Sequence, residues 1–593
     1  MAILRIESFR VLRGSAFGVM QSTLLMSFNA ITVPSHTVRL ARNTFSRQLP
    51  KWIPAENGDA ISDAQQAVSL FAELVLGLQL EAGVPISRFF HVRKLPMLAQ
   101  TKGTSIGIEL ALPSAMMQAS KVAIDWALAA VNSQLSGVSG NMLPSVESAV
   151  KNIPTIAGAG INRFFIFEAI HQLQIPCFEP VEGLIVLGTG KRSRWLNSLS
   201  SDLTPNIGVV LAKDKSKTAR MLRLAGLPGA TNGVVKDALR AVEAAHKLGY
   251  PVVVKPVDAD RGLGVAADLR CPEDVALAFD AAKKISPRIL VEKWVAGYTH
   301  RLTVQDASVI RVVKRVAGGV IGDGTNTITR LVETFQKTPQ QQRMARHLGR
   351  NPLSLDDEAI TLLAQAEINV EYVPKLGQYI KLRRRDNVNA GATNIELNPT
   401  DALSVHPDNI RLAIEAAGVL RLDFAGIDLI MTDIGQSWME IGGLICEVNS
   451  SPQMGGRQDP YLYQRLLKRM FPNGPCVPAE LKIMGSNSAR LDEVRGEILR
   501  SQPDACVSTA KGLWINGQCA TAEYPDSFEA ARGLLQRREA GSIVCLMSIQ
   551  DLYDSGLPMP YWEKISVDDK QYFFAHEAAL LLVVAEWLKN TSK

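Results

Sequence analysis

The sequence predicts an α/β fold with several domains. Its 593 residues are too many for one hydrophobic core, and this length suggests about four domains. From about residue 161 onward, helices alternate with short apolar strands, which is typical of α/β domains. With 47% hydrophobic and 21% charged residues, the composition is that of a soluble globular protein. The net charge is only +6 and the basic residues are dispersed, so we expect no nucleic-acid partner.

Residues 1–160 are predicted to form a domain of strands and helices. Charged residues alternate with apolar ones in residues 3–12, a pattern that favours a strand over a targeting signal. The apolar spacing of residues 64–86 predicts a helix that ends near Gly83. Residues 114–135 predict a second long helix, and no catalytic set of residues emerges in this region.

The middle of the chain shows the clearest alternation of helix and strand. We expect helices at residues 164–176, 214–228 and 238–249, and strands at residues 250–256, 289–295, 422–434 and 439–450. Residues 325–375 are more polar and are predicted to be less regular, with residues 336–351 as a mobile surface loop.

After about residue 476 the composition changes again, to a shorter α/β region. Residues 578–588 are strongly apolar, but spanning a bilayer takes about 20 residues and Glu586 interrupts the run. We therefore predict a buried or oligomer-forming helix and no membrane partner. The seven cysteines are scattered without a C-x-x-C motif, which indicates reduced thiols and a cytoplasmic protein.

Three oxygen-bearing side chains interrupt two apolar strands. Glu447 and Asn449 share one face of the strand that they end, and Asp428 lies in the strand before it. Taken alone, Glu447 and Asn449 fit a solvated strand face followed by an ordinary turn. If the two strands are adjacent, however, the three side chains form a set of hard oxygen ligands suited to Mg²⁺.

Two lysines and a glycine pair indicate phosphate binding. Lys255 ends an apolar strand, where an unpaired ammonium is costly to bury, and Gly262 and Gly264 follow within ten residues. Lys215 lies in the first turn of a predicted helix, where the helix dipole favours an anion. The alternatives are a solvated surface lysine and an ordinary glycine turn, since one G-x-G is a weak signal.

In this order, these residues resemble the ATP-grasp ligases, which include D-alanine–D-alanine ligase. The sequence resembles the cyanophycin synthetase family more closely, in VEKWVAGYTHRLTV, RVAGGVIGDGTNTITRLVE, LRRRDNVNAGAT, VHPDN, LDFAGIDLIMTDI and GGLICEVNSSP. The resemblance is strong over about residues 200–475. It implies an N-terminal domain at 1–160, an α+β ATP-grasp ligase domain at 161–475, and a truncated Mur-ligase-like domain at 476–593.

The resemblance implies a carboxylate–amine ligase that forms an amide through an acylphosphate, with ATP and two Mg²⁺ ions as cofactors. ATP would be bound by Lys215, Lys255, Gly262, Gly264, Glu292, Lys293, Val295 and Thr299. Mg²⁺ would be held by Asp428, Glu447 and Asn449. The catalytic and substrate-binding residues would be Arg301, Arg383 and Asn387, with Arg301 stabilising the acylphosphate and the later oxyanion.

The sequence departs from that family at two places in the ligase region. The acid that usually binds ribose is replaced by Thr299, which predicts weaker ATP binding or tolerance of another nucleotide. Residues 389–392 read Asn-Ala-Gly-Ala in place of the family's Ser-Thr-Gly-Gly, so the substrate need not be the family's aspartate-backbone polymer. An amino acid or short peptide is the expected substrate.

A third departure lies in residues 480–494, where the family's Mur-type domain has a P-loop. Gly485 and Asn487 are kept, but Ala489 and Arg490 replace the lysine and threonine that bind phosphate and Mg²⁺. We expect no ATP turnover in this region and no arginine-adding activity. The alternatives to a ligase are a catalytically silent scaffold and a partner subunit of a cyanophycin-type system, and we expect a homo-oligomer.

Overall fold

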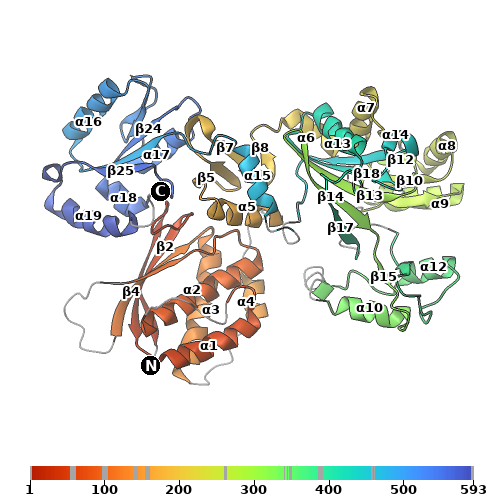
Figure 1. Ribbon diagram of the computed structural model, residues 1–593, viewed down its shortest axis with the longest axis horizontal. Coiled ribbons are helices and arrows are strands. Elements are labelled where there is room, and N and C mark those ends of the chain that lie inside the picture. The colour runs from red at the N-terminus through yellow and green to blue at the C-terminus, as the bar shows by residue number, and fades with distance from the viewer. Residues whose placement is uncertain are drawn as a thin grey trace. The chain divides into compact units, whose positions relative to one another are not determined.

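The computed structural model describes residues 3–53, 62–95, 105–137, 145–153, 160–258, 263–338, 341–342, 345, 350–384, 391–455, 459 and 461–588. It divides into two compact units (Figure 1). Unit 1 comprises residues 1–198 and 453–593, and unit 2 comprises residues 199–452. Each unit combines sheets and helices, so the predicted α/β fold is confirmed.

Unit 1 begins with a four-stranded antiparallel sheet in the order β1-β2-β4-β3. The strands are β1 (Leu4–Leu12), β2 (Thr23–Ile31), β3 (His91–Lys94) and β4 (Ser105–Pro113). The helices α1 (Ser35–Gln48), α2 (Asp63–Ala82), α3 (Met117–Ser136) and α4 (Val146–Asn152) lie on one face of this sheet (Figure 1). The N-terminal strand and the two long helices predicted here are therefore confirmed.

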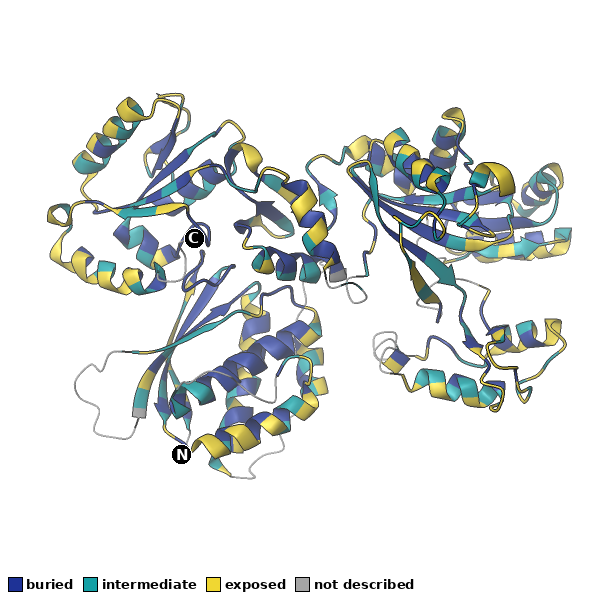
Figure 2. Cartoon of the chain, viewed as in Figure 1, coloured by how far each residue is buried: buried dark blue, intermediate teal, exposed yellow. Residues whose placement is uncertain are grey.

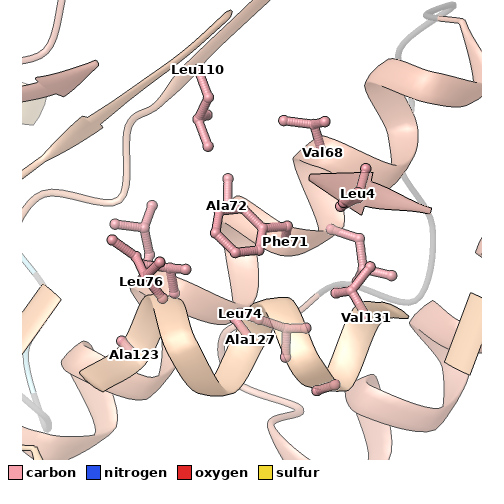
Figure 3. Packing of buried hydrophobic residues seen from close by; sticks show 14 of the residues in the cluster. Leu4, Val68, Phe71, Ala72, Leu74, Leu76, Leu110, Ala123, Ala127 and Val131 are labelled. Atoms are coloured by element: carbon pink, nitrogen blue, oxygen red, sulfur yellow. The ribbon is translucent and has the colours of Figure 1, made fainter. Parts of the chain in front are cut away.

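Helix α2 is the centre of this part of the core. Phe71 lies between the sheet residues Leu4 and Leu110 and the α3 residues Ala127 and Val131 (Figure 3). The helix ends where Gly83 adopts a left-handed conformation with φ of +86°, which a side chain would disfavour.

Residues on both sides of unit 2 in the sequence complete unit 1. Helix α5 (Gly160–Gln172) packs against α15 (Leu462–Met470), with Phe165 stacked on Tyr463 at a centroid distance of 5.4 Å. The strands β5 (Cys177–Val181), β6 (Leu184–Leu187) and β7 (Arg194–Asn197) form a small antiparallel sheet of unit 1, and β8 (Ser200–Ser201) lies in unit 2. The predicted bounds at 160 and 475 thus differ from the ends of the two units, and the three-domain division stays a prediction.

The C-terminal region of unit 1 is a six-stranded sheet in the order β23-β22-β21-β24-β20-β25. Its strands are β20 (Ala479–Met484), β21 (Cys506–Thr509), β22 (Gly512–Ile515), β23 (Gln518–Cys519), β24 (Ile543–Ser548) and β25 (Lys564–Val567). Its helices are α16 (Ser488–Ser501), α17 (Ser527–Leu535), α18 (Ile549–Ser555) and α19 (Ala575–Leu588). The N-terminal residues Leu12 and Phe17 share one hydrophobic cluster with Trp562 and Trp587.

The apolar C-terminal stretch forms α19, as predicted. Val584 and Trp587 are buried on one side of the helix, while Leu582 is exposed. Within the described part of the chain, no helix is long and apolar enough to cross a membrane.

Unit 2 is built around two antiparallel sheets. The first has the order β11-β10-β12-β9 and is covered by α8 (Ala238–Leu248) and α9 (Pro272–Lys283). Its strands are β9 (Asn232–Val235), β10 (Val252–Pro256), β11 (Ala266–Leu269) and β12 (Ile289–Lys293). The second has the order β17-β14-β13-β18-β19, and α6 (Asn206–Lys213), α7 (Lys215–Leu224) and α13 (Pro407–Val419) pack against its strands.

The strands of the second sheet are β13 (Tyr298–Gln305), β14 (Ser308–Val316), β17 (Thr393–Leu397), β18 (Phe424–Met431) and β19 (Leu444–Asn449). Most residues of β10, β12, β13 and β18 are buried (Figure 2). The strands predicted around the candidate site are thereby confirmed, as are the two helices α7 and α8.

The expectation of an irregular region at residues 325–375 is wrong in part. These residues include α10 (Ile328–Gln336) and α12 (Asp357–Gln365), next to the two-stranded sheet of β15 (Gly319–Ile321) and β16 (Tyr379–Lys381). The polar composition hides a small core that contains Ile328, Val332, Leu353, Leu363 and Ile380. Half of the loop predicted at residues 336–351 lies outside the described residues.

Candidate functional site

The central strands of the second sheet of unit 2 carry a row of charged side chains. Arg301 on β13 is directly opposite Asp428 on β18, and Asp428 is directly opposite Glu447 on β19. Directly opposite residues of antiparallel strands place their side chains on the same face. Asn449 is opposite Gly426, two residues along the same strands, so it shares that face. The adjacency of the strands that carry Asp428, Glu447 and Asn449 was predicted from the sequence and is confirmed.

Asp428 is 2% exposed and is held by two arginines. Arg301 donates to both carboxylate oxygens, with an Nη2–Oδ2 distance of 2.7 Å, and Arg315 Nη1 lies 3.4 Å from Oδ2. Burial alone would raise the pKa of Asp428, but the two guanidinium groups outweigh it and lower the pKa below its usual value. The carboxylate is therefore ionised and charge-compensated.

Gly426 leaves room for the Arg301 side chain. A Cβ at this position would lie 3.0 Å from Arg301 Nη1 and 2.8 Å from Pro452 Cβ. A glycine in the middle of a buried strand is otherwise unfavourable, so close packing explains its presence.

Glu447 and Lys215 form a second ion pair at the end of the row. Lys215 Nζ lies 3.3 Å from Glu447 Oε1, and Lys215 is the first residue of α7. Asp214 caps this helix by accepting hydrogen bonds from the N–H groups of Ser216 and Lys217. The helix start that places Lys215 beside the row is thus fixed by a local side-chain contact.

The oxygen-bearing groups Asp428, Glu447 and Asn449 fit a Mg²⁺ site in chemistry and placement. Their side chains lie on one face of neighbouring strands. Two carboxylates and one amide oxygen are the hard oxygen donors that Mg²⁺ prefers, together with substrate phosphates. The described residues contain no group of three or more His, Cys, Asp and Glu side chains that could hold a metal.

The first sheet of unit 2 contributes a buried ion pair. Lys255 on β10 donates to Glu292 Oε1 on β12 at 2.5 Å, and both side chains are buried. Burial alone would lower the pKa of Lys255, but Glu292 and, more weakly, Glu447 on the other sheet raise it. Lys255 is therefore charged and lies within electrostatic range of the row on the second sheet.

Asn232 is a candidate residue that sequence reasoning missed. It is directly opposite Glu292 on the paired strands β9 and β12. Asn232 Nδ2 and Glu292 Oε2 are both buried, and neither has a partner in the part of the chain that is described. A donor and an acceptor are thus adjacent and unsatisfied, which is costly unless a ligand supplies their partners. No sequence motif includes Asn232, because only strand pairing places it there.

The other proposed nucleotide-binding residues within the described part of the chain lie on or near these strands and on β13. Lys293 Nζ donates to the carbonyl oxygens of Gly249 and Tyr250 at 2.7 and 3.2 Å. Val295 is half-buried, and Thr299 is opposite Arg315. Gly264 has φ of +72°.

Three predicted residues are not placed at this site by the described part of the chain. Gly262 and Asn387 lie outside the described residues. Arg383 is buried beside α12, where it donates to both carboxylate oxygens of Asp356 at 3.0 and 2.8 Å and to the carbonyl of Ser354 at 3.2 Å. No contact between Arg383 and the Asp428 row occurs among the described residues, and its substrate-binding role stays a prediction.

The turn that resembles a P-loop in unit 1 already holds an anion. It joins β20 to α16, and Asn487 Oδ1 caps the helix by accepting from the N–H groups of Ala489 and Arg490. The Ser486 N–H donates to Glu577 Oε1 at 2.8 Å, and the Ser486 hydroxyl donates to the same oxygen. The anion at this helix start is therefore a carboxylate of the chain itself.

Arg490 is likewise engaged within unit 1. Its Nε and Nη2 lie 2.9 and 3.0 Å from the two carboxylate oxygens of Asp568. Hydrogen bonding to Asp568 is the main cause that raises the pKa of Arg490 above its ordinary value. Arg490 thus forms an internal salt bridge with Asp568.

Two protein-family models match parts of the chain that lie wholly or mostly in unit 2. Residues 214–310 match the carbamoyl-phosphate synthase L chain, ATP binding domain, and this range contains Lys215, Lys255, Glu292 and Arg301. Residues 381–460 match the RimK-like ATP-grasp domain, and this range contains Asp428, Glu447 and Asn449. The two matches therefore span both halves of the residue set described above.

The chain is homologous to cyanophycin synthetases. It is 35% identical over 271 residues to the cyanophycin synthetase of Trichormus variabilis, which covers 45% of this chain and 29% of that protein. It is 30% identical over 243 residues to the glutathione biosynthesis bifunctional protein GshAB of Streptococcus agalactiae, covering 37% of this chain and 30% of that protein. The chain thus matches less than half the length of these curated relatives.

Among solved structures, a bifunctional glutathione synthetase from Pasteurella multocida matches with a TM-score of 0.39 and 21% identity. The match covers 59% of this chain and 49% of that chain.

Proposed function

We propose that the chain is an ATP-dependent carboxylate–amine ligase that forms an amide bond through an acylphosphate. The observation that carries this proposal is the row of Arg301, Asp428, Glu447 and Asn449, facing Lys215 and Lys255. Phosphoryl transfer requires cationic side chains that bind the phosphates and oxygen ligands that bind Mg²⁺, and this set of residues offers both. The match to ATP-binding and ATP-grasp models over these residues supports the same function.

Each group has a role in the two chemical steps. Lys215 and Lys255 offset the charge of the ATP phosphates while a substrate carboxylate oxygen attacks the γ-phosphorus and ADP leaves. Asp428, Glu447 and Asn449 would hold two Mg²⁺ ions, which would neutralise charge on the phosphates. An amine then attacks the acyl carbon, and the bond between that carbon and the bridging phosphate oxygen breaks. Phosphate leaves with this oxygen and the bonding electron pair, and the amine nitrogen loses a proton to give the amide. Arg301 stabilises the negative oxygens of the acylphosphate and of the tetrahedral intermediate.

The carboxylate substrate is an amino acid or short peptide, with Arg383 and Asn387 as its proposed ligands. A guanidinium can bind a carboxylate through two parallel hydrogen bonds. Because Arg383 is held by Asp356, this role requires Asp356 to give up at least one of its two hydrogen bonds.

The direct test is ADP release by the purified full-length chain with Mg-ATP and a panel of amino acids and dipeptides, singly and in pairs. We expect release that depends on one carboxylate–amine pair and is abolished in Glu447→Ala. If ATP binds with Mg²⁺ but no pair supports turnover, the partner-subunit alternative is favoured, and co-purification with a Mur-type enzyme tests it. If ATP does not bind, the scaffold alternative replaces the ligase.

Nucleotide choice provides a second test. The unsatisfied Asn232 donor and Glu292 acceptor match the N7 acceptor and N6 donor of adenine, whereas guanine carries a second acceptor at O6. Thr299 offers ribose a neutral hydrogen bond in place of a charge-assisted one. We expect ATP to bind more tightly than GTP, and Thr299→Asp to strengthen ATP binding by a few-fold. Calorimetric titration of both nucleotides measures this, and an unchanged dissociation constant would contradict the role of Thr299.

A further inference from the structure

We propose that unit 1 contains a second small-molecule site, a cavity that binds the zwitterion of an amino acid or short peptide. The cavity measures about 340 Å³, at the lower end of the range for ligand pockets. It is lined by the β1–β2 turn, the start of α3, strand β5, α17 and residues 558–560. None of these residues belongs to unit 2, so the cavity is separate from the proposed ligase site.

The cavity contains a guanidinium without a carboxylate partner. Arg532 on α17 donates to the carbonyl oxygen of Arg13 at 2.8 Å and lies over the rings of Phe528 and Phe178 at 4.4 and 5.1 Å. Across the described residues, no carboxylate lies within ion-pair distance of Arg532. Burial is the main cause that lowers its pKa to about 10. A ligand carboxylate would compensate this charge.

Ser15 supplies an unsatisfied hydroxyl group in the same cavity, whereas Arg532 already donates to the carbonyl oxygens of Arg13 and Pro558. The Ser15 side chain is 3% exposed, and its hydroxyl has no hydrogen-bond partner within the described part of the chain. Burying a hydroxyl without a partner is unfavourable. Ser15 and Arg532 both line the cavity, and each can donate a hydrogen bond to an anionic group of a ligand.

The negative charge in the lining favours a zwitterion over a simple anion as the ligand of this cavity. Glu182 is exposed at the cavity and forms no ion pair with any described residue, while the neighbouring Glu179 is held by Arg163. Burial raises the pKa of the Cys177 thiol to about 12, while Glu179 raises it further and Arg532 lowers it, so Glu179 and Arg532 both lie near Cys177. A carboxylate would bind Arg532, and an ammonium group would face Glu182.

The rest of the lining suits an apolar side chain between the two charged ends. Met20, Phe167, Phe178 and Met559 contribute to the lining. Methionine and aromatic side chains are adaptable apolar surfaces for a ligand. An amino acid or short peptide with an apolar side chain therefore matches the cavity in charge, polarity and size.

The test compares three six-carbon probes of different charge: the zwitterion L-norleucine, the anion hexanoate and the cation hexylamine. Binding to the full-length chain is measured by isothermal titration calorimetry. We expect norleucine to bind about tenfold more tightly than either singly charged probe. We expect Arg532→Met to abolish this binding, Glu182→Gln to remove the advantage over hexanoate, and Ser15→Ala to weaken norleucine by a few-fold.

Arg383→Met serves as the control for binding at the ligase site, because Arg383 is the proposed ligand of the substrate carboxylate there, and it is expected to bind norleucine like the unaltered chain. Equal binding of the three probes, no binding of norleucine, or full binding by Arg532→Met would overturn the second site. Binding lost only in Arg383→Met would also overturn it while leaving the ligase proposal in place. If Arg532→Met fails to fold, as judged by circular dichroism, Glu182→Gln and Ser15→Ala decide the question.

Discussion

Replacing Arg301 by methionine is expected to lower the free energy of unfolding of unit 2 by about 3–5 kcal/mol. The substitution removes both hydrogen bonds that Arg301 makes to Asp428 and leaves a buried carboxylate with only the 3.4 Å contact to Arg315. ADP formation should fall by about 10²–10³-fold, since Arg301 is the proposed ligand of the developing negative oxygens. Hydrogen exchange of β13, β18 and β19 in urea measures the stability, and steady-state kinetics measures the rate.

A second substitution separates stability from catalysis. In Arg301→Met/Asp428→Leu the unpaired charge is gone, so most of the lost stability should return while activity stays absent. Arg240→Met is the matched control, because Arg240 is exposed and pairs with Glu243 on the surface, where the expected change is about 0–1 kcal/mol. An active double variant would refute the proposed roles of Arg301 and Asp428. A single variant as stable as the unaltered chain would refute the importance of their ion pair.

Replacing Glu577 by alanine is expected to destabilise the C-terminal sheet region of unit 1 by about 3–5 kcal/mol. Glu577 is 0% exposed and accepts hydrogen bonds from the Ser486 N–H, the Ser486 hydroxyl and, at 2.8 Å, the Phe574 N–H. Alanine would leave these donors without an acceptor beside the start of α16. Because Glu577 is on α19, the docking of that helix and of Trp587 should weaken as well, which hydrogen exchange of α19 would detect.

The contribution of Glu577 should also depend on pH. Burial alone would raise its pKa, but the hydrogen bonds from Ser486 and Phe574 outweigh it and lower the pKa. A lowered pKa means that the stabilisation is complete above the ordinary glutamate pKa and is lost as the pH falls through the lowered value. Glu577→Gln should therefore show a smaller loss of stability on acidification than the unaltered chain. Glu563→Ala, at an exposed site, is the control and should change little.

Local patterns in the sequence were sufficient to predict the main strands and carboxylates of the candidate site. The apolar runs of β10, β12, β18 and β19 were predicted because a strand buried on both faces reads as a continuous hydrophobic segment. Asp428 and Glu447 stood out because a carboxylate inside such a run needs a partner. Their adjacency followed from two consecutive strands about 20 residues apart.

Contacts between distant segments could not be predicted in this way. Polar composition concealed the small core of residues 320–382, because its apolar residues are few and are brought together from several elements. Asn232 carries no local signal, since its meaning comes from its place opposite Glu292 on another strand.

The sequence by itself determined the α/β character of the chain, the strands that carry Asp428, Glu447 and Asn449, and the helix that begins at Lys215. Each of these depends on residue periodicity or a local cap, which are properties of neighbouring residues. Only the tertiary structure decided that Arg301 compensates Asp428, that Glu577 fills the turn at Ser486, and that Arg532 lines a cavity without a carboxylate partner. The first two contacts join residues that are 127 and 91 positions apart in the sequence. The third depends on which groups are absent around Arg532 among the described residues. Neither property can be predicted from neighbouring residues in the sequence.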